Sequence, residues 1–153
     1  MFDRILSLFT GPQDFATPLP VADAQNALGA LMVRAAKADR AYLFEEVEQI
    51  DAVLAKLYDL NPVEAAMMRA GCEKLEEEMP RTEDLAGILH SAISKDDREA
   101  AVAALWSVVF ADGVEHEEED ELLHAVEAAL GVDKATSKRL HDQEMAKRPA
   151  VRG

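Results

Sequence analysis

Cysteine is nearly absent from this chain, with Cys72 alone among 153 residues. A single thiol excludes an internal disulfide framework and a four-cysteine zinc site. Basic residues are scarce as well, because 16 lysines and arginines stand against 30 acids and leave a formal net charge of −14 at pH 7. Nucleic acids and anionic lipids are bound through clustered cations. The charge balance therefore predicts no nucleic-acid partner.

Long apolar runs are also missing. The longest, residues 102–111, is interrupted by Ser107 and falls well short of the roughly 20 residues of a membrane-spanning helix. The first residues do not resemble a secretory signal, since charged side chains break a short apolar stretch. We therefore expect a cytoplasmic protein.

Residues 1–21 are predicted to form an N-terminal amphipathic segment and a proline-rich linker. The apolar side chains gather in residues 2–9, and Pro12, Pro18 and Pro20 follow them. The segment lacks the basic face of a strong membrane anchor. We expect it to pack on the protein's own bundle, and membrane contact through residues 2–9 is the less favoured alternative.

Apolar residues make up 49% of the chain, and they recur at helical spacing. Leu123, Val126 and Leu130 mark one such stripe, and no segment sustains the two-residue alternation of a strand. We predict an all-α fold, a bundle of about seven helices in one domain over residues 22–148, followed by a disordered tail at 149–153. The expected helices cover roughly 22–38, 44–59, 62–78, 82–93, 95–111, 117–130 and 134–147.

Helix ends can also be located in the sequence. Asn61 precedes Pro62, so the pair supplies an N-cap and a proline at the first helical position. Gly131 directly follows the stripe that ends at Leu130, which indicates a C-terminal stop.

An internal repeat relates the two halves at an offset of 73 residues. Ala38-Asp39 aligns with Ala111-Asp112, and the acids that follow align too: Glu45, Glu46 and Glu48 with Glu118, Glu119 and Glu121. Each unit consists of an apolar helix, an Ala-Asp turn, an acidic helix start and a second amphipathic helix. We predict two related helix-turn-helix repeats packed about a pseudo-twofold axis.

The phrases KADRAYLFEEVEQIDAVL and ALWSVVFADGVEHEEEDELLHAVEAALGV resemble the two repeats of the TerB-like family, which is associated with bacterial tellurite resistance. The segment NPVEAAMMRAGCEKLEEEMP is similar to the middle of that family. The resemblance covers roughly residues 22–135. It implies an all-helical bundle with two related halves, and some relatives carry acidic residues proposed to bind a divalent cation.

The acids of the two turns form the sharpest candidate site. Asp39 and Glu46 lie seven residues apart across the first turn, as do Asp112 and Glu119 across the second. A pseudo-twofold axis would bring these carboxylates to one end of the bundle, where all-oxygen clusters suit Ca²⁺ or Mg²⁺. The predicted ligands of a divalent cation are Asp39, Glu46, Asp112 and Glu119, with Glu115 and Glu118 in reserve. The alternative is that these acids only stabilise helix starts, by about 0.3–1 kcal/mol each.

The first turn departs from the family pattern. Arg40 stands where the second turn has Gly113, and glycine allows backbone angles that arginine resists. This places the first half-site in doubt and favours a one-sided site at Asp112 and Glu119.

Cys72, the only cysteine of the chain, is a candidate nucleophile. Acids next to it would raise its pKa, so we expect a small buried hydrophobe instead. No P-loop, dinucleotide fingerprint or nucleophile elbow is present.

The predicted function is therefore a non-enzymatic TerB-like module of the tellurite or stress response, acting through an unknown protein partner, as a monomer or homodimer. Two alternatives stay open. One is a purely acidic scaffold that binds no metal. The other is a hydrolase or redox enzyme that uses the carboxylates or Cys72.

Overall fold

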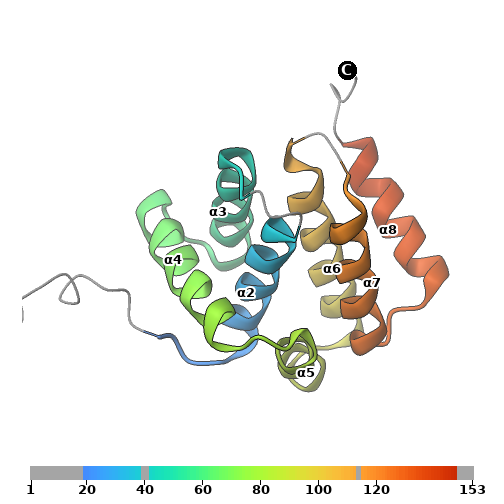
Figure 1. Cartoon of the computed structure of the whole chain (residues 1–153), viewed down its shortest axis with the longest axis horizontal. Helices are drawn as coiled ribbons and strands as arrows, with labels where there is room; N and C mark the ends of the chain where they lie inside the picture. Colours follow the sequence, from blue (N-terminus) through green and yellow to red (C-terminus); the bar gives the residue numbers. More distant parts are fainter. Residues whose placement is uncertain (1–18, 39–41, 113–114, 148–153) are drawn as a thin grey trace, which may run out of the picture.

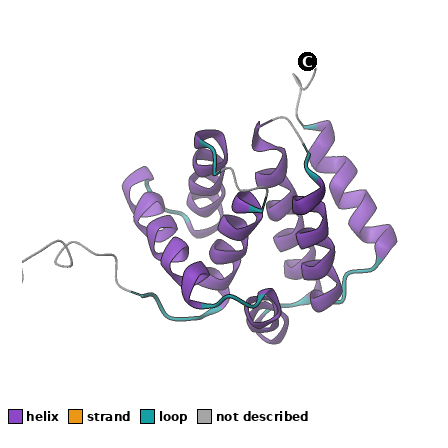
Figure 2. Ribbon diagram, in the orientation of Figure 1, coloured by secondary structure: helices purple, strands orange, loops and turns teal. Residues whose placement is uncertain are grey.

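The computed structural model describes residues 19–38, 42–112 and 115–147, with the side chain of Asp112 outside the description. These residues form seven α-helices and one 3₁₀ helix and contain no strand (Figures 1 and 2). The elements are α2 (Ala24–Lys37), α3 (Phe44–Tyr58), α4 (Pro62–Glu78), α5 (Thr82–Ala92), α6 (Lys95–Val109), η2 (Phe110–Asp112), α7 (Glu117–Leu130) and α8 (Lys134–Ala146). The all-α prediction is confirmed.

The helix ends follow the local signals of the sequence. Asn61 accepts a hydrogen bond from the Glu64 amide at 2.8 Å, so α4 begins at Pro62 as expected. Gly131 ends α7 in the left-handed conformation, with φ of 75°. The sixth predicted helix differs, because its α-helical part stops at Val109 and tightens into η2. Such a 3₁₀ turn satisfies carbonyls that an α-helix leaves open at its end.

Helix α2 is the centre of the bundle. It packs against α3, α4, α5, α6 and α7, and side chains all around it are buried, from Ala27 through Val33. A helix that carries apolar side chains on every side can remove them from water only when other helices surround it. Leu105, Trp106 and Leu123 extend the same core into α6 and α7.

Arg34 directly follows this buried stretch, and it ties α2 to the end of α4. Its guanidinium donates to the Glu76 carboxylate at 3.1 Å and to the Glu76 carbonyl at 2.7 Å. It also donates to the Met79 carbonyl. Carbonyls at a helix C-terminus lack partners within the helix, so this contact both neutralises Arg34 and caps α4.

The helices α4 and α8 hold similar places in the chain order but pack differently. α4 packs closely on both α2 and α3, whereas α8 packs on α6 and makes few backbone contacts with α7. Figure 1 shows α8 at the outer edge of the bundle beside α6 and α7. The second half is therefore more open between its last two helices.

Several predictions concern residues beyond this description. The amphipathic segment 2–9, the linker before residue 19 and the tail at 149–153 all lie outside the described residues, so the domain boundaries stay predictions. Among the described helices, none combines the length and the apolar composition that crossing a bilayer requires.

Candidate functional site

Two buried glutamates lie at the starts of α3 and α7. Glu46 and Glu119 each occupy the third helical position, and both side chains are 0% exposed. Glu46 Oε1 accepts a hydrogen bond from the Leu43 amide at 2.9 Å, and Glu119 Oε1 accepts one from the His116 amide at 3.1 Å. Each glutamate therefore satisfies a backbone donor just before its helix. The sequence placed these acids at helix starts but did not show that they are buried.

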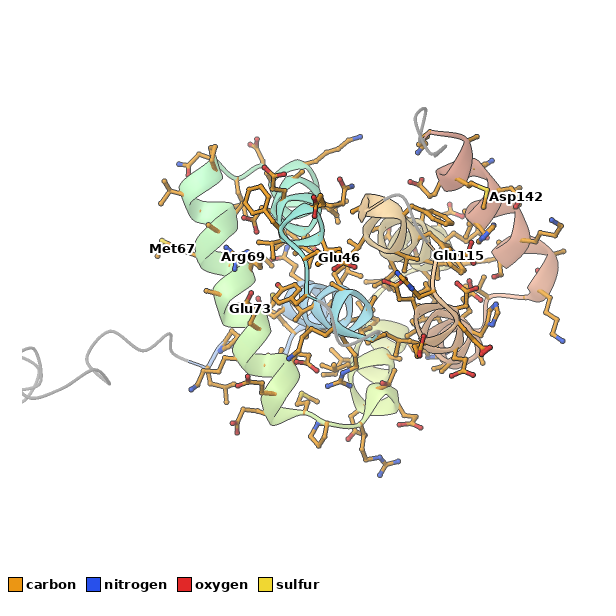
Figure 3. The ribbon with its side chains drawn as sticks, turned by 45° about the horizontal axis from the view of Figure 1, so that its top comes forward. Glu46, Met67, Arg69, Glu73, Glu115 and Asp142 are labelled. Atoms are coloured by element: carbon orange, nitrogen blue, oxygen red, sulfur yellow. The ribbon has the colours of Figure 1, made fainter. Side chains whose placement is uncertain are left out.

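The two helix starts lie at the same end of the bundle. The 3₁₀ helix η2, which leads into the second turn, contacts α3, which follows the first turn. In Figure 3 this end faces the reader, with Glu46 beside α3 and Glu115 before α7. The helix starts of both units thus lie near each other, although the internal repeat as a whole stays a prediction.

The remaining predicted cation ligands have different surroundings. Asp39 lies outside the described residues, and so does the side chain of Asp112. Glu118 is exposed to solvent, and Glu115 is engaged by His141. Within the described residues, no group of three or more histidines, cysteines and acids is arranged to hold a metal ion. A complete cation site therefore needs the aspartates of the turns.

Glu115 belongs to a three-residue cluster with Asp120 and His141. His141 Nε2 lies 3.0 Å from Glu115 Oε1, and Glu115 also shares a hydrogen bond with Asp120. Burial and the neighbouring Glu115 raise the pKa of Asp120 from 3.8 to about 7. Burial opposes the charge of Glu115, but hydrogen bonds from Asp120 and His141 lower its pKa overall. Of the two carboxyls, Asp120 is therefore the one with the raised pKa and Glu115 the one with the lowered pKa.

His141 connects α8 to this cluster. Burial opposes its protonation, but hydrogen bonds to Asp142 and Glu115 raise its pKa above the ordinary value. Its ring stands edge-on to Trp106, with the two centroids 4.7 Å apart, and to Phe110 at 5.2 Å. The imidazole thus lies between the aromatic core of α6 and the acids before α7.

A different set of side chains lies after the first turn, just before α3 and on α3 and α4. Tyr42 donates its hydroxyl to Glu73 at 2.7 Å. Arg69 donates to the same Glu73 at 2.9 Å and to Asp51 at 2.6 Å. Burial and the contact with Glu73 raise the pKa of Tyr42. A tyrosine and an arginine therefore share the Glu73 carboxylate beside α3, whereas a histidine and two carboxyls form the cluster beside α7.

A groove opens between α7 and α8, next to the second turn, and encloses about 750 Å³. Trp106 and Glu127 line it together with Ser137 and His141. The sequence analysis did not select any of these four residues as a site. One signal was available: Glu127 follows Val126 on the stripe that α7 buries, and a charged residue there is unusual.

Cys72 is buried in α4, and the prediction of a buried small side chain is confirmed. Burial, followed by the charges of Asp23 and Glu73, raises the pKa of its thiol to about 12. The reactive thiolate is therefore scarce near neutral pH.

These features define the class of the protein: an all-helical bundle whose two acidic helix starts share one end. The family model described as Tellurite resistance protein TerB matches residues 25–142. The chain therefore belongs to the TerB family, as the resemblance implied. No curated protein and no solved structure matches the chain.

Proposed function

We propose that this protein is a non-enzymatic interaction module of the tellurite or stress response, and that it binds a protein partner at its acidic end. The observation that carries the proposal is Phe44. This phenylalanine is 70% exposed at the first position of α3, directly after the first turn. Leu43 beside it is 38% exposed.

The surroundings of Phe44 support a specific partner chemistry. Glu45 and Glu48 are exposed on the same helix start. An exposed aromatic side chain with charged residues next to it is typical of protein–protein contact sites. Because those charges are acidic, we expect a partner surface that combines an apolar pocket with basic residues.

Replacement of Phe44 by serine is expected to abolish function without affecting the fold, because the ring is largely exposed. In cells whose own copy of the gene is deleted, Phe44→Ser should restore survival on potassium tellurite at least about tenfold less well than the wild type, as expected for a lost interface anchor. Met67→Ser is the matched control, since Met67 is 67% exposed but lies on α4. Equal survival of the Phe44→Ser and wild-type strains, at equal protein levels, would show that this surface is not the functional one.

The second part of the proposal is a divalent cation, with Ca²⁺ or Mg²⁺ favoured, at the acidic turns. The burial of Glu46 and Glu119 at matching helix starts supports it, and so does the preference of hard cations for carboxylate oxygens. Asp112 and Glu119 are the proposed ligands from the second turn, Asp39 and Glu46 those from the first, and Glu115 and Glu118 complete the set. A bound cation would join the two turns and orient Phe44 toward the partner.

Calorimetric titration of Ca²⁺, Mg²⁺ and Zn²⁺ into chelator-treated protein tests this part. We expect saturable binding that Asp112→Asn/Glu119→Gln abolishes. Glutamine keeps the oxygen that accepts from the His116 amide, so the helix cap survives and only charge is removed. Glu64→Gln is the matched control, because Glu64 caps the Asn61 amide in the same way at 3.0 Å but is exposed on α4.

Weak heats that are identical in the double variant and the wild type would remove the cation from the proposal. They would leave the alternative in which the acids serve only solubility and partner choice. The Phe44 experiment is independent of this result.

A further inference from the structure

The groove between α7 and α8 has a carboxylate at its base. Glu127 is 4% exposed, and both hydrogen bonds described for it reach Oε2, from Trp106 Nε1 at 3.2 Å and from Ser137 Oγ. No described hydrogen bond reaches Oε1. Burying a carboxylate is costly unless a charge or several donors compensate for lost water. The two neutral donors orient the group, and no ion pair among the described residues neutralises its charge.

The bundle does not need this carboxylate to close. At the offset of 73 residues, Leu54 corresponds to Glu127 and Val33 corresponds to Trp106. Both are 0% exposed core residues, and α3 packs closely on α4 in that half. At the positions that correspond in the sequence, the first half thus buries Leu54 where the second half buries Glu127.

Acids from both helices also line the sides of the groove. Asp120 comes from α7 and Asp142 from α8, and Glu115 lies before α7. Figure 3 shows Glu115 and Asp142 on the side of the molecule where α8 lies. Two lysines line the groove as well, Lys134 and Lys138. The ammonium of Lys138 is engaged by Asp142 at 3.0 Å, and no described ion pair joins Lys134 to Glu127. The base of the groove therefore offers a negative charge with apolar surface from Trp106 around it.

We infer that this groove binds a small organic cation, whose ammonium or guanidinium group pairs with Glu127. Glu127 lies two helical turns beyond Glu119 on α7, so the base of the groove is distinct from the proposed cation site at the turns, and Glu115 borders both. The same cationic group can belong to a free amine or to a lysine or arginine side chain of a partner, and the two sources are distinguishable by experiment.

Trp106 is the only tryptophan of the chain, so its fluorescence reports directly on the groove. Putrescine and agmatine should each produce a saturable change, and glutarate at equal ionic strength should produce none. Glu127→Gln keeps an acceptor for Trp106 and Ser137 but removes the charge, and it should weaken binding at least about tenfold. Glu121→Gln is the matched control, since Glu121 is exposed on α7 and does not line the groove.

A second variant keeps the test decisive if Glu127→Gln alters the fold. Ala128 lines the groove and is exposed, so Ala128→Phe narrows the groove from its open side without entering the core. It should weaken putrescine binding while the far-UV circular dichroism spectrum stays that of the wild type. Asp112→Asn/Glu119→Gln should bind putrescine as the wild type does, which separates this inference from the proposed cation site.

Two outcomes would overturn the inference. One is the absence of any saturable response to putrescine or agmatine. The other is equal weakening by Glu121→Gln and Glu127→Gln, which would reveal only general attraction to an acidic surface. If a trilysine peptide binds more tightly than putrescine, the cationic group comes from a protein partner, and the reverse order assigns a free amine.

Discussion

Replacement of Gly29 by alanine is expected to lower the free energy of unfolding by about 2–3 kcal/mol, the upper range for overpacking a core. A Cβ at Gly29 would lie 2.3 Å from Cys72 Sγ and 3.2 Å from Cys72 Cβ. Both residues are fully inside the bundle, where α2 packs on α4. Alanine is the better helix former by about 1 kcal/mol, but this gain is smaller than the cost of separating two packed helices.

Urea unfolding of two controls isolates the steric cause. Gly87→Ala should be neutral or stabilising, because Gly87 is exposed in α5 and a Cβ there meets nothing within 4 Å. In a Cys72→Ala background, Gly29→Ala should cost under about 1 kcal/mol, since the sulfur is gone. A Gly29→Ala protein as stable as the wild type would mean that α2 and α4 are not packed as closely as described.

Replacement of Trp106 by alanine should have the larger effect, a loss of about 3–5 kcal/mol. The indole is 1% exposed and packs on Phe110 and His141. Its removal leaves a large cavity and also deprives the buried Glu127 of a donor. For a chain of this length each kcal/mol lowers Tm by about 2–4 °C, so the melting temperature should fall by about 6–20 °C.

A pair of milder variants separates packing from hydrogen bonding in the same melting experiment. Trp106→Phe keeps an aromatic ring but leaves Glu127 without the Nε1 donor. Trp106→Phe/Glu127→Leu removes both polar partners and should recover part of the lost stability. If the double variant is less stable than Trp106→Phe alone, Glu127 stabilises the fold through contacts other than those with Trp106.

The candidate site was predictable only in part. Glu46 and Glu119 could be placed at helix starts because capping depends on residues three positions apart. Their burial depends on how η2 and α3 come together, which no local pattern encodes. The cluster of Glu115, Asp120 and His141 was not predicted either. His141 contacts Glu115 from 26 residues further along the chain, so no local pattern connects them.

Local patterns in the amino-acid sequence predicted the helices and most of their ends, and two phrases of the sequence pointed to the TerB family. Apolar spacing, caps and the stop at Gly131 act over a few residues, so they can be recognised without knowledge of the fold. The packing of α8 on α6, which leaves a groove beside α7, became visible only in three dimensions. The placement of α8 depends on contacts between distant segments, such as Ser137 with Glu127 and His141 with Trp106. Such contacts join residues that are not neighbours along the chain, so a local sequence pattern does not reveal them.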